Sequence, residues 1–490
     1  LNARILDEAV LVVLCGDLVL ELGLDCVEQL QQSGVDMVTV AGEEVAFDAP
    51  SSRVRVVTDP QNFEDWERMA AQIRENKEFF RGTHCVVITD VVNPAQGIPG
   101  LTTSLRGIIQ MEVSVKKESK NKLIDEQTAL YKSLSKLIHD DHSLAIDEIS
   151  ESDKPVTDKE REGYSFVPTS VRALRQMAGV LPETCLSVPE DIASILIAQL
   201  RTSFANARPG HRISGSVILG TAGARLTFPG AKDAINLAKQ IDIILQDKNP
   251  FKLKLNIDIV SDSPPVCDLI LQSAFKDPHS GVNGGPVPIP EIQLARMIDY
   301  LISDDGVLHP GLQKFSPDDR VEVQSLFVDQ GLNPRLFADT TAKSLVELRL
   351  APGNKDKSAV EKLKKYLLEN KVPGFELKIT EDKGASPWMT TISHPVFPLM
   401  LESLEKGFGK KSCLYGCGGT IPFVEKLMEA LGDVQPLCLG AYDPDAKMHE
   451  PGESLSMPDL LGCTRSIIHL ISRIQEVYGP AEQNQKNLLE

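Results

Sequence analysis

Short apolar runs alternate with amphipathic stretches along the first hundred residues. Asp36–Ala41 (DMVTVA) and Cys85–Thr89 (CVVIT) are apolar runs of strand length, and Phe63–Phe80 between them has apolar residues at helical spacing. A compact apolar run is typical of a buried strand, and strand–helix–strand order is typical of an α/β sheet. The pattern therefore predicts an α/β layer at the start of the chain.

The middle of the chain has a different pattern. Glu151–Glu162 is dense in charge and contains Pro155, so we expect a loop or linker there. The flanking residues alternate without a regular strand–helix order, which favours an α+β arrangement. The expected helices are Asn121–His139, Ile192–Phe204, Ile289–Ser303 and Ser358–Glu369, and the expected strands are Leu105–Val115, Leu253–Val260 and Lys343–Leu350.

The α/β alternation returns from about Ser393. Helices are predicted at Val396–Lys406, from near Thr420, and at Met457–Tyr478, with a strand at Val434–Leu439. The simplest architecture is one α/β domain built from both ends of the chain, with an α+β domain inserted between them. We place the boundaries at 1–106, 107–385 and 386–490, and residues 116–274 form an insertion that this scheme leaves unexplained.

Composition and charge narrow the class of protein. The chain has 490 residues, of which 42% are hydrophobic and 24% charged, as in ordinary globular proteins. Its formal net charge of -18 makes nucleic acid and anionic membranes unsuitable partners. No apolar run has the length of a membrane span, and no basic leader precedes the first apolar run. The nine cysteines include no Cys-x-x-Cys pair, so we expect them to be reduced and buried, as in a cytoplasmic protein.

Polar residues directly follow three of the predicted strands. Glu43 and Glu44 follow the first strand, Asp90 follows the second, and Asp443-Pro-Asp445 and then His449 follow the last. In open α/β sheets functional groups collect beyond the carboxyl ends of strands, and oxygen ligands with an imidazole suit zinc, manganese or cobalt. Each residue alone also fits a plainer interpretation, namely a solvated turn, a helix cap or a surface histidine.

Two glycine-rich turns carry further candidates. In Gly416-Cys-Gly-Gly-Thr-Ile-Pro422, glycines allow close backbone approach, Thr420 is a candidate N-cap, and the N–H groups of the following helix could bind a carboxylate. The alternative is an ordinary strand-to-helix turn. His279 lies in a second glycine-rich turn, Lys276–Pro286, just before the predicted helix Ile289–Ser303.

Five motifs in this order resemble the carnosinase, aminoacylase and succinyl-diaminopimelate desuccinylase family of co-catalytic zinc peptidases, most closely its dipeptidase branch. The resemblance covers about Asn76–Val115 and Phe275–Ile471. The motifs are Leu101-Thr-Thr-Ser-Leu-Arg-Gly107, Pro278-His-Ser-Gly-Val-Asn-Gly-Gly285, Arg349-Leu-Ala-Pro-Gly353, Gly416-Cys-Gly-Gly-Thr-Ile-Pro-Phe423 and His449-Glu-Pro-Gly-Glu453.

The resemblance implies a fold and an activity. The fold would be an α/β catalytic domain, with a mixed sheet and helices on both faces, and an inserted α+β lid domain that often dimerises. The activity would be hydrolysis of a dipeptide or N-acyl amino acid with a free carboxylate. Two divalent metal ions would serve as cofactors, with zinc as the first choice and manganese or cobalt as alternatives.

The resemblance also implies residue roles. Glu43 would be the general base, and His279 would steady the tetrahedral oxyanion. Arg349 would bind the substrate carboxylate, in a pocket lined by Gly418, Gly419 and Thr420. The metal ligands would be Asp17, Glu44, Asp90 and His449.

The sequence departs from the family pattern near its start. The early Gly-His-x-Asp segment that carries a metal ligand is not found, and His139-Asp-Asp141 has similar letters in a helical region. Glu43 and Asp17 also lack their usual neighbours. These departures leave three hypotheses: a metal-dependent dipeptidase, a hydrolase with a single metal, and an inactive relative that serves as a binding or scaffold protein. The helix Ile289–Ser303 could support a homodimer or pack on its own sheet.

Overall fold

The computed structural model describes most of the chain outside its first 82 residues. The described residues are 10–15, 37–41, 54–58, 83–89, 91–118, 124–139, 144–154, 158, 172, 175–176, 178–187, 204–207, 220–277, 287–312, 320–328, 331–336, 342–446 and 452–478. The chain divides into two compact units. The terminal unit comprises Leu1–Leu105, Pro155–Thr169 and Pro387–Glu490, and the central unit comprises Arg106–Lys154 and Ser170–Ser386.

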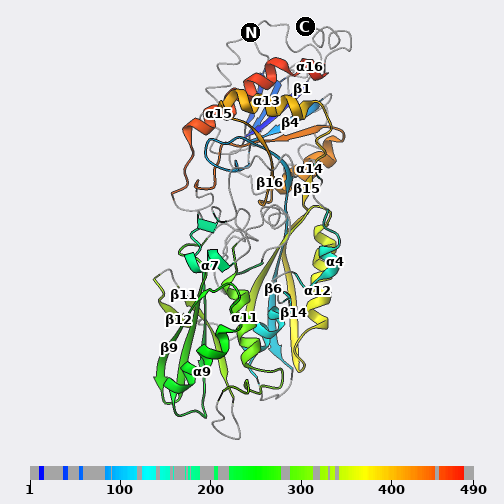
Figure 1. Cartoon of the computed structure of the whole chain (residues 1–490). Coiled ribbons are helices and arrows are strands. Elements are labelled where there is room, and N and C mark those ends of the chain that lie inside the picture. Colours follow the sequence, from blue (N-terminus) through cyan, green and yellow to red (C-terminus); the bar gives the residue numbers. More distant parts are fainter. Residues whose placement is uncertain are drawn as a thin grey trace. The chain divides into compact units, whose positions relative to one another are not determined.

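The terminal unit contains an eight-stranded sheet built from both ends of the chain (Figure 1). Seven strands follow the order β15-β5-β17-β4-β1-β3-β2, and β16 pairs with β5. The sheet is mixed, because β17 and β15 run antiparallel to β5 while the other pairs are parallel. The strands are β1 (Val10–Cys15), β2 (Met37–Ala41), β3 (Val54–Thr58), β4 (Thr83–Ile88), β5 (Gly100–Leu105), β15 (Trp388–Met389), β16 (Cys413–Cys417) and β17 (Gln435–Cys438).

Apolar residues explain the central position of β4. Cys85, Val86 and Val87 are completely buried, so both faces of this strand are covered. Strands of parallel sheets read as continuous apolar runs for this reason. The predicted strands Asp36–Ala41, Cys85–Thr89 and Val434–Leu439 are confirmed as β2, β4 and β17, with ends that differ by no more than two residues.

Four helices lie in the described part of the terminal unit: α13 (Val396–Phe408), α14 (Pro422–Leu431), α15 (Met457–Arg473) and α16 (Gln475–Tyr478). Helices α13 and α15 approach closely where both present glycine. A Cβ added to Gly407 would lie 2.1 Å from Ser466 Oγ and 2.3 Å from the Gly462 carbonyl oxygen. Small residues at this crossing therefore set the distance between the two helices. Gly409, with φ of +66°, ends α13 in the left-handed conformation that favours glycine.

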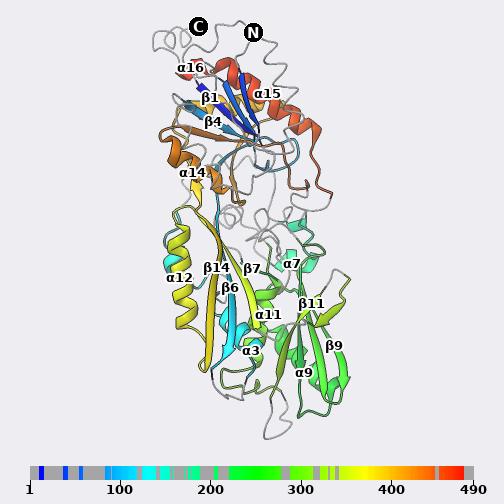
Figure 2. The ribbon, with the colours of Figure 1, turned by 180° about the vertical axis from the view of Figure 1, so that it is seen from behind.

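The central unit contains two antiparallel sheets, seen from the other side in Figure 2. The five-stranded sheet has the order β12-β11-β8-β10-β9, and the four-stranded sheet has the order β14-β6-β13-β7. The strands are β6 (Gly107–Lys117), β7 (Phe204–Ala207), β8 (Thr221–Thr227), β9 (Lys254–Asp262), β10 (Pro265–Gln272), β11 (Glu322–Val328), β12 (Pro334–Leu336), β13 (Ala342–Leu350) and β14 (Phe375–Ala385).

Among the residues that the structure describes, six helices accompany these sheets: α3 (Glu126–Ser135), α4 (Asp147–Ser150), α7 (Pro182–Ser187), α9 (Ala234–Gln246), α11 (Pro290–Leu301) and α12 (Asp356–Glu369). One apolar cluster joins residues from both sheets with α3, α9, α11 and α12. The predicted helices Ile289–Ser303 and Ser358–Glu369 are confirmed as α11 and α12, while the predicted Asn121–His139 helix is shorter, because Asp125 caps α3 and Lys136 ends it. Phe204 begins strand β7 rather than ending a helix. Residues 63–80 and 192–203 lie outside the described residues.

The apolar face of α11 packs inside the central unit. Ile292, Leu294, Ala295, Met297 and Ile298 are each at most 1% exposed and belong to the apolar cluster of this unit. A helix face that is already covered by its own sheet and by α3 is not available to a second copy of the chain. Of the two interpretations open from the sequence, packing on its own sheet is the observed one, so the α11 face gives no support to a homodimer.

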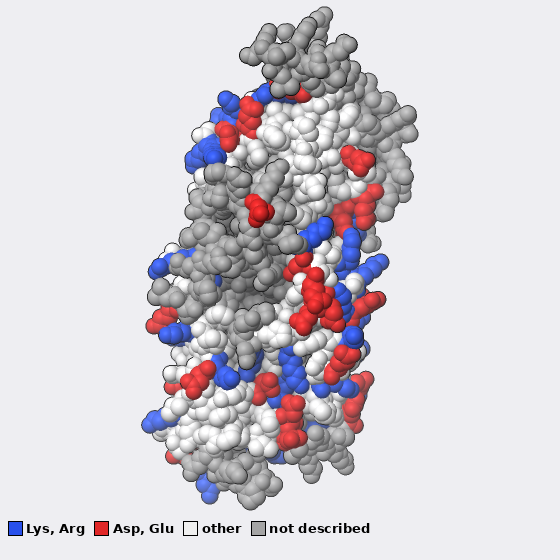
Figure 3. All heavy atoms as spheres, turned by 45° about the vertical axis from the view of Figure 1, so that its right-hand side comes forward, with Lys and Arg blue, Asp and Glu red and all other residues white. Residues whose placement is uncertain are grey.

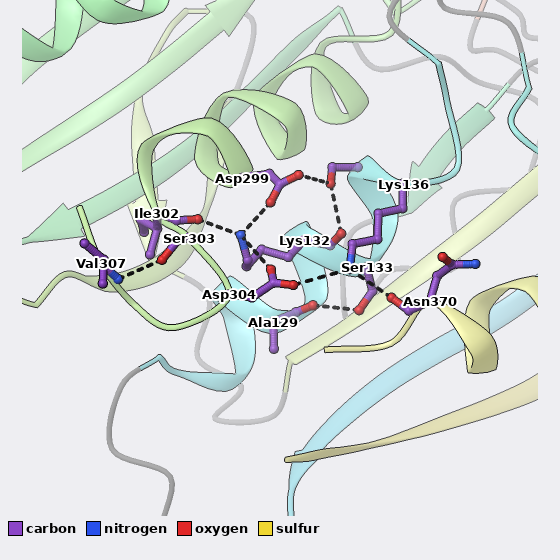
Figure 4. Close-up of polar contacts among 11 residues, drawn as sticks. Ala129, Lys132, Ser133, Lys136, Asp299, Ile302, Ser303, Asp304, Val307 and Asn370 are labelled. Atoms are coloured by element: carbon purple, nitrogen blue, oxygen red, sulfur yellow. Dashed lines mark hydrogen bonds and ion pairs between the residues drawn. The ribbon is translucent and has the colours of Figure 1, made fainter. Parts of the chain in front are cut away.

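A buried lysine joins α3 to the end of α11 (Figure 4). Lys132 is 1% exposed, and its Nζ donates to Asp299 Oδ1 at 2.5 Å and to the carbonyl oxygen of Ile302 at 2.6 Å. Asp304 lies 3.1 Å from the same Nζ, and Ser135 Oγ donates to Asp299 Oδ2 at 2.7 Å. Two carboxylates and the C-terminal carbonyl of a helix thus compensate the desolvated ammonium group.

Three further features concern the surface charges, the cysteines and the apolar character of the helices. Figure 3 shows acidic and basic side chains intermingled over the visible face. The seven cysteines whose side chains are described are free and buried: Cys85, Cys185, Cys267, Cys413, Cys417, Cys438 and Cys463. Among the described residues, no helix combines the length and the apolar character that a bilayer-crossing segment needs.

Candidate active site

Five strands of the terminal unit end together at one edge of the sheet. In the parallel register, Ala41 of β2 and Cys15 of β1 are both partners of Thr58 of β3. Ile88 of β4 is in turn a partner of Leu14 of β1 and of Cys438 of β17. The carboxyl ends of β2, β3, β1, β4 and β17 therefore meet at the same edge, which is where open α/β sheets bind ligands.

Four predicted site residues directly follow these strands in the sequence. Asp17 comes two residues after β1, Glu43 and Glu44 come two and three residues after β2, and Asp90 comes two residues after β4. All four lie outside the described residues, as do His449 and His279. The described strands thus show where the backbone leads to the predicted carboxylates, but not where those side chains lie.

The segment after β4 is held against the segment after β17. Val92 and Tyr442 form a parallel bridge, and the Asn93 N–H donates to the Tyr442 carbonyl oxygen at 2.8 Å. Gly440 contacts the backbone of Val91 so closely that an added Cβ would lie 1.6 Å from the Val91 carbonyl oxygen. Position 440 therefore requires glycine, because any side chain would force the residue after Asp90 out of its place.

The Asn93 side chain joins three segments of this edge. Its Nδ2 donates to the Gly440 carbonyl oxygen at 2.8 Å, and its Oδ1 accepts from the Gly100 N–H, at the start of β5, at 3.2 Å. The residue is 1% exposed, so neither bond competes with bulk water. The two partners also fix which side-chain atom is nitrogen, since a carbonyl needs a donor and an N–H needs an acceptor.

The loop that contains His449 is closed at its base. The Ser454 N–H donates to the Ala446 carbonyl oxygen at 2.9 Å, so the ends of the intervening segment meet. The turn before it is built on Asp443, whose Oδ1 accepts from the Asp445 N–H at 2.8 Å and whose carbonyl oxygen accepts from the Ala446 N–H at 3.1 Å. These bonds define where the backbone enters and leaves the His449 loop.

Asp443 is a buried carboxylate among other carboxylates. It is 5% exposed, and burial raises the pKa of its carboxyl group above the usual range, as do the charges of Asp445 and Asp459, while the hydrogen bond from the Asp445 N–H lowers it. Asp459 is fully buried and accepts from the Gly97 N–H at 2.9 Å. Within the described residues, no group of three or more histidines, cysteines and acidic residues could hold a metal ion.

The glycine-rich turn joins β16 to α14. Gly418 is buried, whereas Gly419 and Thr420 are half-buried. The Gly419 N–H points to Cys417 Sγ at 3.4 Å. The predicted N-cap at Thr420 is wrong by one residue: Ile421 is the N-cap, with φ of -119° and ψ of 89°, and no side chain caps the helix. Pro422 at the first helical position excludes the helical conformation from the residue before it, which explains the shift.

A buried hydroxyl lies beside this turn. Ser104 of β5 is the register partner of Gly416 and is 1% exposed. The described residues offer its Oγ no hydrogen-bond partner. Buried polar atoms are normally satisfied, and this hydroxyl is one of several exceptions among the described residues of the terminal unit.

The glycine-rich turn with His279 has firmly anchored ends in the central unit. Ala274 before it and Val287 after it are both buried in one small apolar cluster with Ala178, Val180 and Cys185. The Phe275 N–H donates to the Gly179 carbonyl oxygen at 2.8 Å, and Asp277 Oδ1 accepts from the Gly220 N–H at 2.8 Å. Both ends of this turn are therefore fixed in the same small apolar cluster of the central unit.

Arg349 is buried on β13 and carries a carboxylate partner. It is 3% exposed, and its Nε donates to Glu347 Oε1 at 2.9 Å. Glu347 lies two residues earlier on the same strand and is 1% exposed, so both side chains point to the same face of the sheet. The ion pair lowers the cost of burying the guanidinium group.

Three residues of the terminal unit were not singled out from the sequence: Asn93, Gly440 and Ser104. A glycine directly after an apolar strand was the available signal for Gly440. The hydrogen bond from Asn93 to Gly440 joins residues 347 positions apart, so no local pattern reports it.

Comparison with known proteins identifies the fold. No protein-family model matches the sequence. The di-peptidase Dug1p of Saccharomyces cerevisiae is similar in structure, with a TM-score of 0.57 at 13% identity over 96% of this chain and 80% of that chain. An M20 family metallo-carboxypeptidase, Sso-CP2 of Sulfolobus solfataricus, has a TM-score of 0.52 at 12% identity over 98% of this chain and 86% of that chain.

Human carnosine dipeptidase 1 has a TM-score of 0.50 at 12% identity, over 88% of this chain and 67% of that chain. At such identities these likenesses show the fold and nothing finer. The chain has the fold of these metallo-carboxypeptidase and dipeptidase structures, so the likeness to the carnosinase-type peptidases predicted from the motifs is confirmed at the level of the fold.

Proposed function

We propose that the protein is a metal-dependent peptidase that hydrolyses a small amide, either a dipeptide or an N-acyl amino acid with a free carboxylate. One observation carries the proposal. The strands that lead to Asp17, Glu44 and Asp90 end side by side, and the segment after β17, which leads to His449, is bonded to the residues just after Asp90. The register of these described strands supports a common location for the four proposed ligands, which come from distant parts of the sequence.

The proposed ligands would hold two divalent ions. Asp17, Glu44 and Asp90 would supply carboxylate oxygens and His449 an imidazole nitrogen, which suits zinc, with manganese or cobalt as alternatives. When bound, such ions lower the pKa of water and polarise an amide carbonyl. The acidic surface of the chain, with its net charge of -18, also favours the accumulation of cations.

The protein's own residues would move the proton and hold the substrate. Glu43 would take a proton from the attacking water as oxygen bonds to the amide carbon, and would deliver it to the amine nitrogen as the C–N bond breaks. His279 would donate a hydrogen bond to the tetrahedral oxyanion. Arg349 would bind the substrate carboxylate, because a guanidinium group matches a carboxylate in shape and charge. The same role is proposed for Gly418, Gly419 and Thr420, which precede the amino end of α14.

Replacement of one ligand tests the proposal. The His449→Ala variant should lose metal-dependent hydrolysis of dipeptides by a factor of at least about 100, because loss of a ligand removes both affinity and the activated water. The matched control is His139→Ala, since His139 is half exposed in the central unit, 3.8 Å from Asp147. Unchanged hydrolysis in the His449→Ala variant would contradict the assignment.

The metal content separates this function from its alternative. The sequence lacks the early Gly-His-x-Asp segment of the family, which favours an inactive relative that binds a partner. Elemental analysis of the purified protein after addition of zinc, manganese or cobalt should give two ions per chain for the peptidase, and one ion for a mono-metal hydrolase. A protein that retains no ion and hydrolyses none of a panel of dipeptides would be the binding protein.

Two further expectations accompany the proposed function. The cytoplasmic location is supported by the free, buried cysteines among the described residues. A homodimer through the lid domain also remains a proposal, which light scattering of the purified protein tests directly, although the helix that suggested it is buried.

A further inference from the structure

We propose that Asn93 and Gly440 are positioning residues of the metal site: together they hold the backbone that carries Asp90 against the segment that leads to His449. The proposal rests on the proposed function, because it assigns Asp90 and His449 as ligands. It concerns two described residues, neither of which is a ligand or touches substrate in the proposed mechanism.

The first argument is steric. Gly440 follows β17 by two residues, and its missing side chain leaves room for the peptide of Val91. An added Cβ would lie 1.6 Å from the Val91 carbonyl oxygen, 2.6 Å from its carbonyl carbon and 3.0 Å from its nitrogen. No side-chain rotation relieves a clash with backbone, so the two segments can only approach in this way with glycine at position 440.

The second argument concerns hydrogen bonding. The Leu439 N–H donates to the Ile88 carbonyl oxygen at 2.9 Å, and the Asn93 N–H donates to the Tyr442 carbonyl oxygen at 2.8 Å. Between these two backbone bonds the Asn93 carboxamide donates to the Gly440 carbonyl oxygen at 2.8 Å. Hydrogen bonds therefore join the segment after β4 to the segment after β17 on both sides of Val91, the residue that follows Asp90 in the chain.

The third argument is burial. Thr89 and Val91, the two neighbours of Asp90 in the chain, are 3% and 2% exposed. Asn93 is 1% exposed, and its Oδ1 also holds the Gly100 N–H at the start of β5. The carboxamide thus links the backbone next to Asp90 and the segment after β17 to the start of β5. Outer residues that orient metal ligands act in this way.

Two substitutions test the inference. Asn93→Asp keeps the acceptor for the Gly100 N–H but loses the donor to the Gly440 carbonyl oxygen, and Gly440→Ala separates the segments. In each variant, zinc affinity measured by competition with a chromophoric chelator should fall by on the order of tenfold or more. The absorption spectrum of the cobalt-loaded variants should also change, because the ligands no longer hold the same geometry.

Matched controls separate positioning from stability. Asn249 has the same kind of bonds, with Nδ2 donating to the Leu253 carbonyl oxygen at 2.7 Å and Oδ1 accepting from the Leu253 N–H at 2.9 Å, but it lies in the central unit. Gly409 has no atom within 4 Å of an added Cβ. Asn249→Asp and Gly409→Ala should lower the melting temperature of the metal-free protein and leave zinc affinity unchanged.

A measurement on the unaltered protein tests the inference even if the variants do not fold. Addition of zinc should slow hydrogen exchange in peptides that cover 91–100 and 439–446, but not in a peptide that covers β9. If the unaltered protein binds zinc and these peptides exchange at an unchanged rate, or if both variants bind zinc as the unaltered protein does, the inference is wrong and the proposed function stands. If the unaltered protein binds no divalent ion, the proposed function itself fails.

Discussion

The buried carboxylate of Asp443 orders a turn, but its negative charge lowers the stability of the folded protein. Its carboxylate organises the turn before the His449 loop through the Asp445 N–H. Burial, Asp445 and Asp459 together raise its pKa, so the charged form is less favourable in the folded protein than in the unfolded chain. The folded protein therefore binds this proton more tightly, and the carboxylate costs stability once it is ionised.

The sign of the pH dependence follows from linkage. Because the folded pKa lies above the unfolded one, stability falls as pH rises from the unfolded pKa through the folded pKa, and the loss is complete above both values. Asp443→Asn keeps an acceptor for the Asp445 N–H and removes the charge. In EDTA, the variant should melt higher than the unaltered protein at neutral pH, and the difference should vanish at pH values below about 4.

Thermal melting followed by circular dichroism at several pH values checks this expectation. A variant that is less stable at neutral pH would show that the carboxylate charge is compensated by a partner. EDTA is needed because a bound ion near the His449 loop would add its own pH dependence.

At the scale of secondary-structure elements, a buried cation is the centre of the polar contacts between α3 and the end of α11. Lys132→Met retains most of the side-chain volume but removes the donor to Asp299 and to the Ile302 carbonyl oxygen. We expect the free energy of unfolding to fall by about 2 kcal/mol, because the carbonyl is left buried without its partner, while Asp299 can be partly rehydrated.

Lys136 provides the matched control for this substitution. It is the C-cap residue of α3, and its side chain is 30% exposed. Its Nζ lies 3.7 Å from Asp304 Oδ2 and donates to the Asn370 carbonyl oxygen at 3.1 Å. Lys136→Met should cost less than about 1 kcal/mol, as is usual for partly exposed ion pairs. Urea denaturation of both variants measures the difference, and equal losses would contradict the special role of Lys132.

Elements with a strong local pattern could be predicted from the sequence, and elements defined by distant pairing could not. The apolar run at Cys85–Thr89 predicted β4, and the amphipathic run at Ser358–Glu369 predicted α12, each to within two residues. Strand β7 was missed because Phe204 follows a helical pattern, and its strand state comes from pairing with β13, where Phe204 is the partner of Leu348.

Some residues of the candidate site could be predicted from the sequence, and others could not. Carboxylates after strands could be recognised because parallel strands share an edge, and the register of β1, β2, β3, β4 and β17 supports that reasoning. Asn93 and Gly440 could not be recognised, because their roles arise from a contact between segments more than 300 residues apart in the chain.

At the scale of the whole molecule, the two units should respond differently to metal removal. The proposed ligands all belong to the terminal unit, so bound ions should stabilise that unit by roughly 3 kcal/mol when their concentration is about 100 times the dissociation constant. Calorimetry should show one transition that falls on addition of EDTA and a second that does not.

Hydrogen exchange assigns the two transitions. Peptides from β4 and β17 report the terminal unit, and peptides from β6 and β13 report the central unit. A single transition that shifts as a whole would show that the units unfold together, which contradicts this prediction.

The strand order of the terminal unit also constrains its synthesis on the ribosome. Strand β17 lies between β4 and β5, although more than 300 residues separate it from either in the chain. A nascent chain therefore carries an unfilled position at the centre of this sheet until residues 435–438 emerge, while every described strand of the central unit has already been translated. Chaperones that shield incomplete sheets should stay bound to the first strands until that late moment.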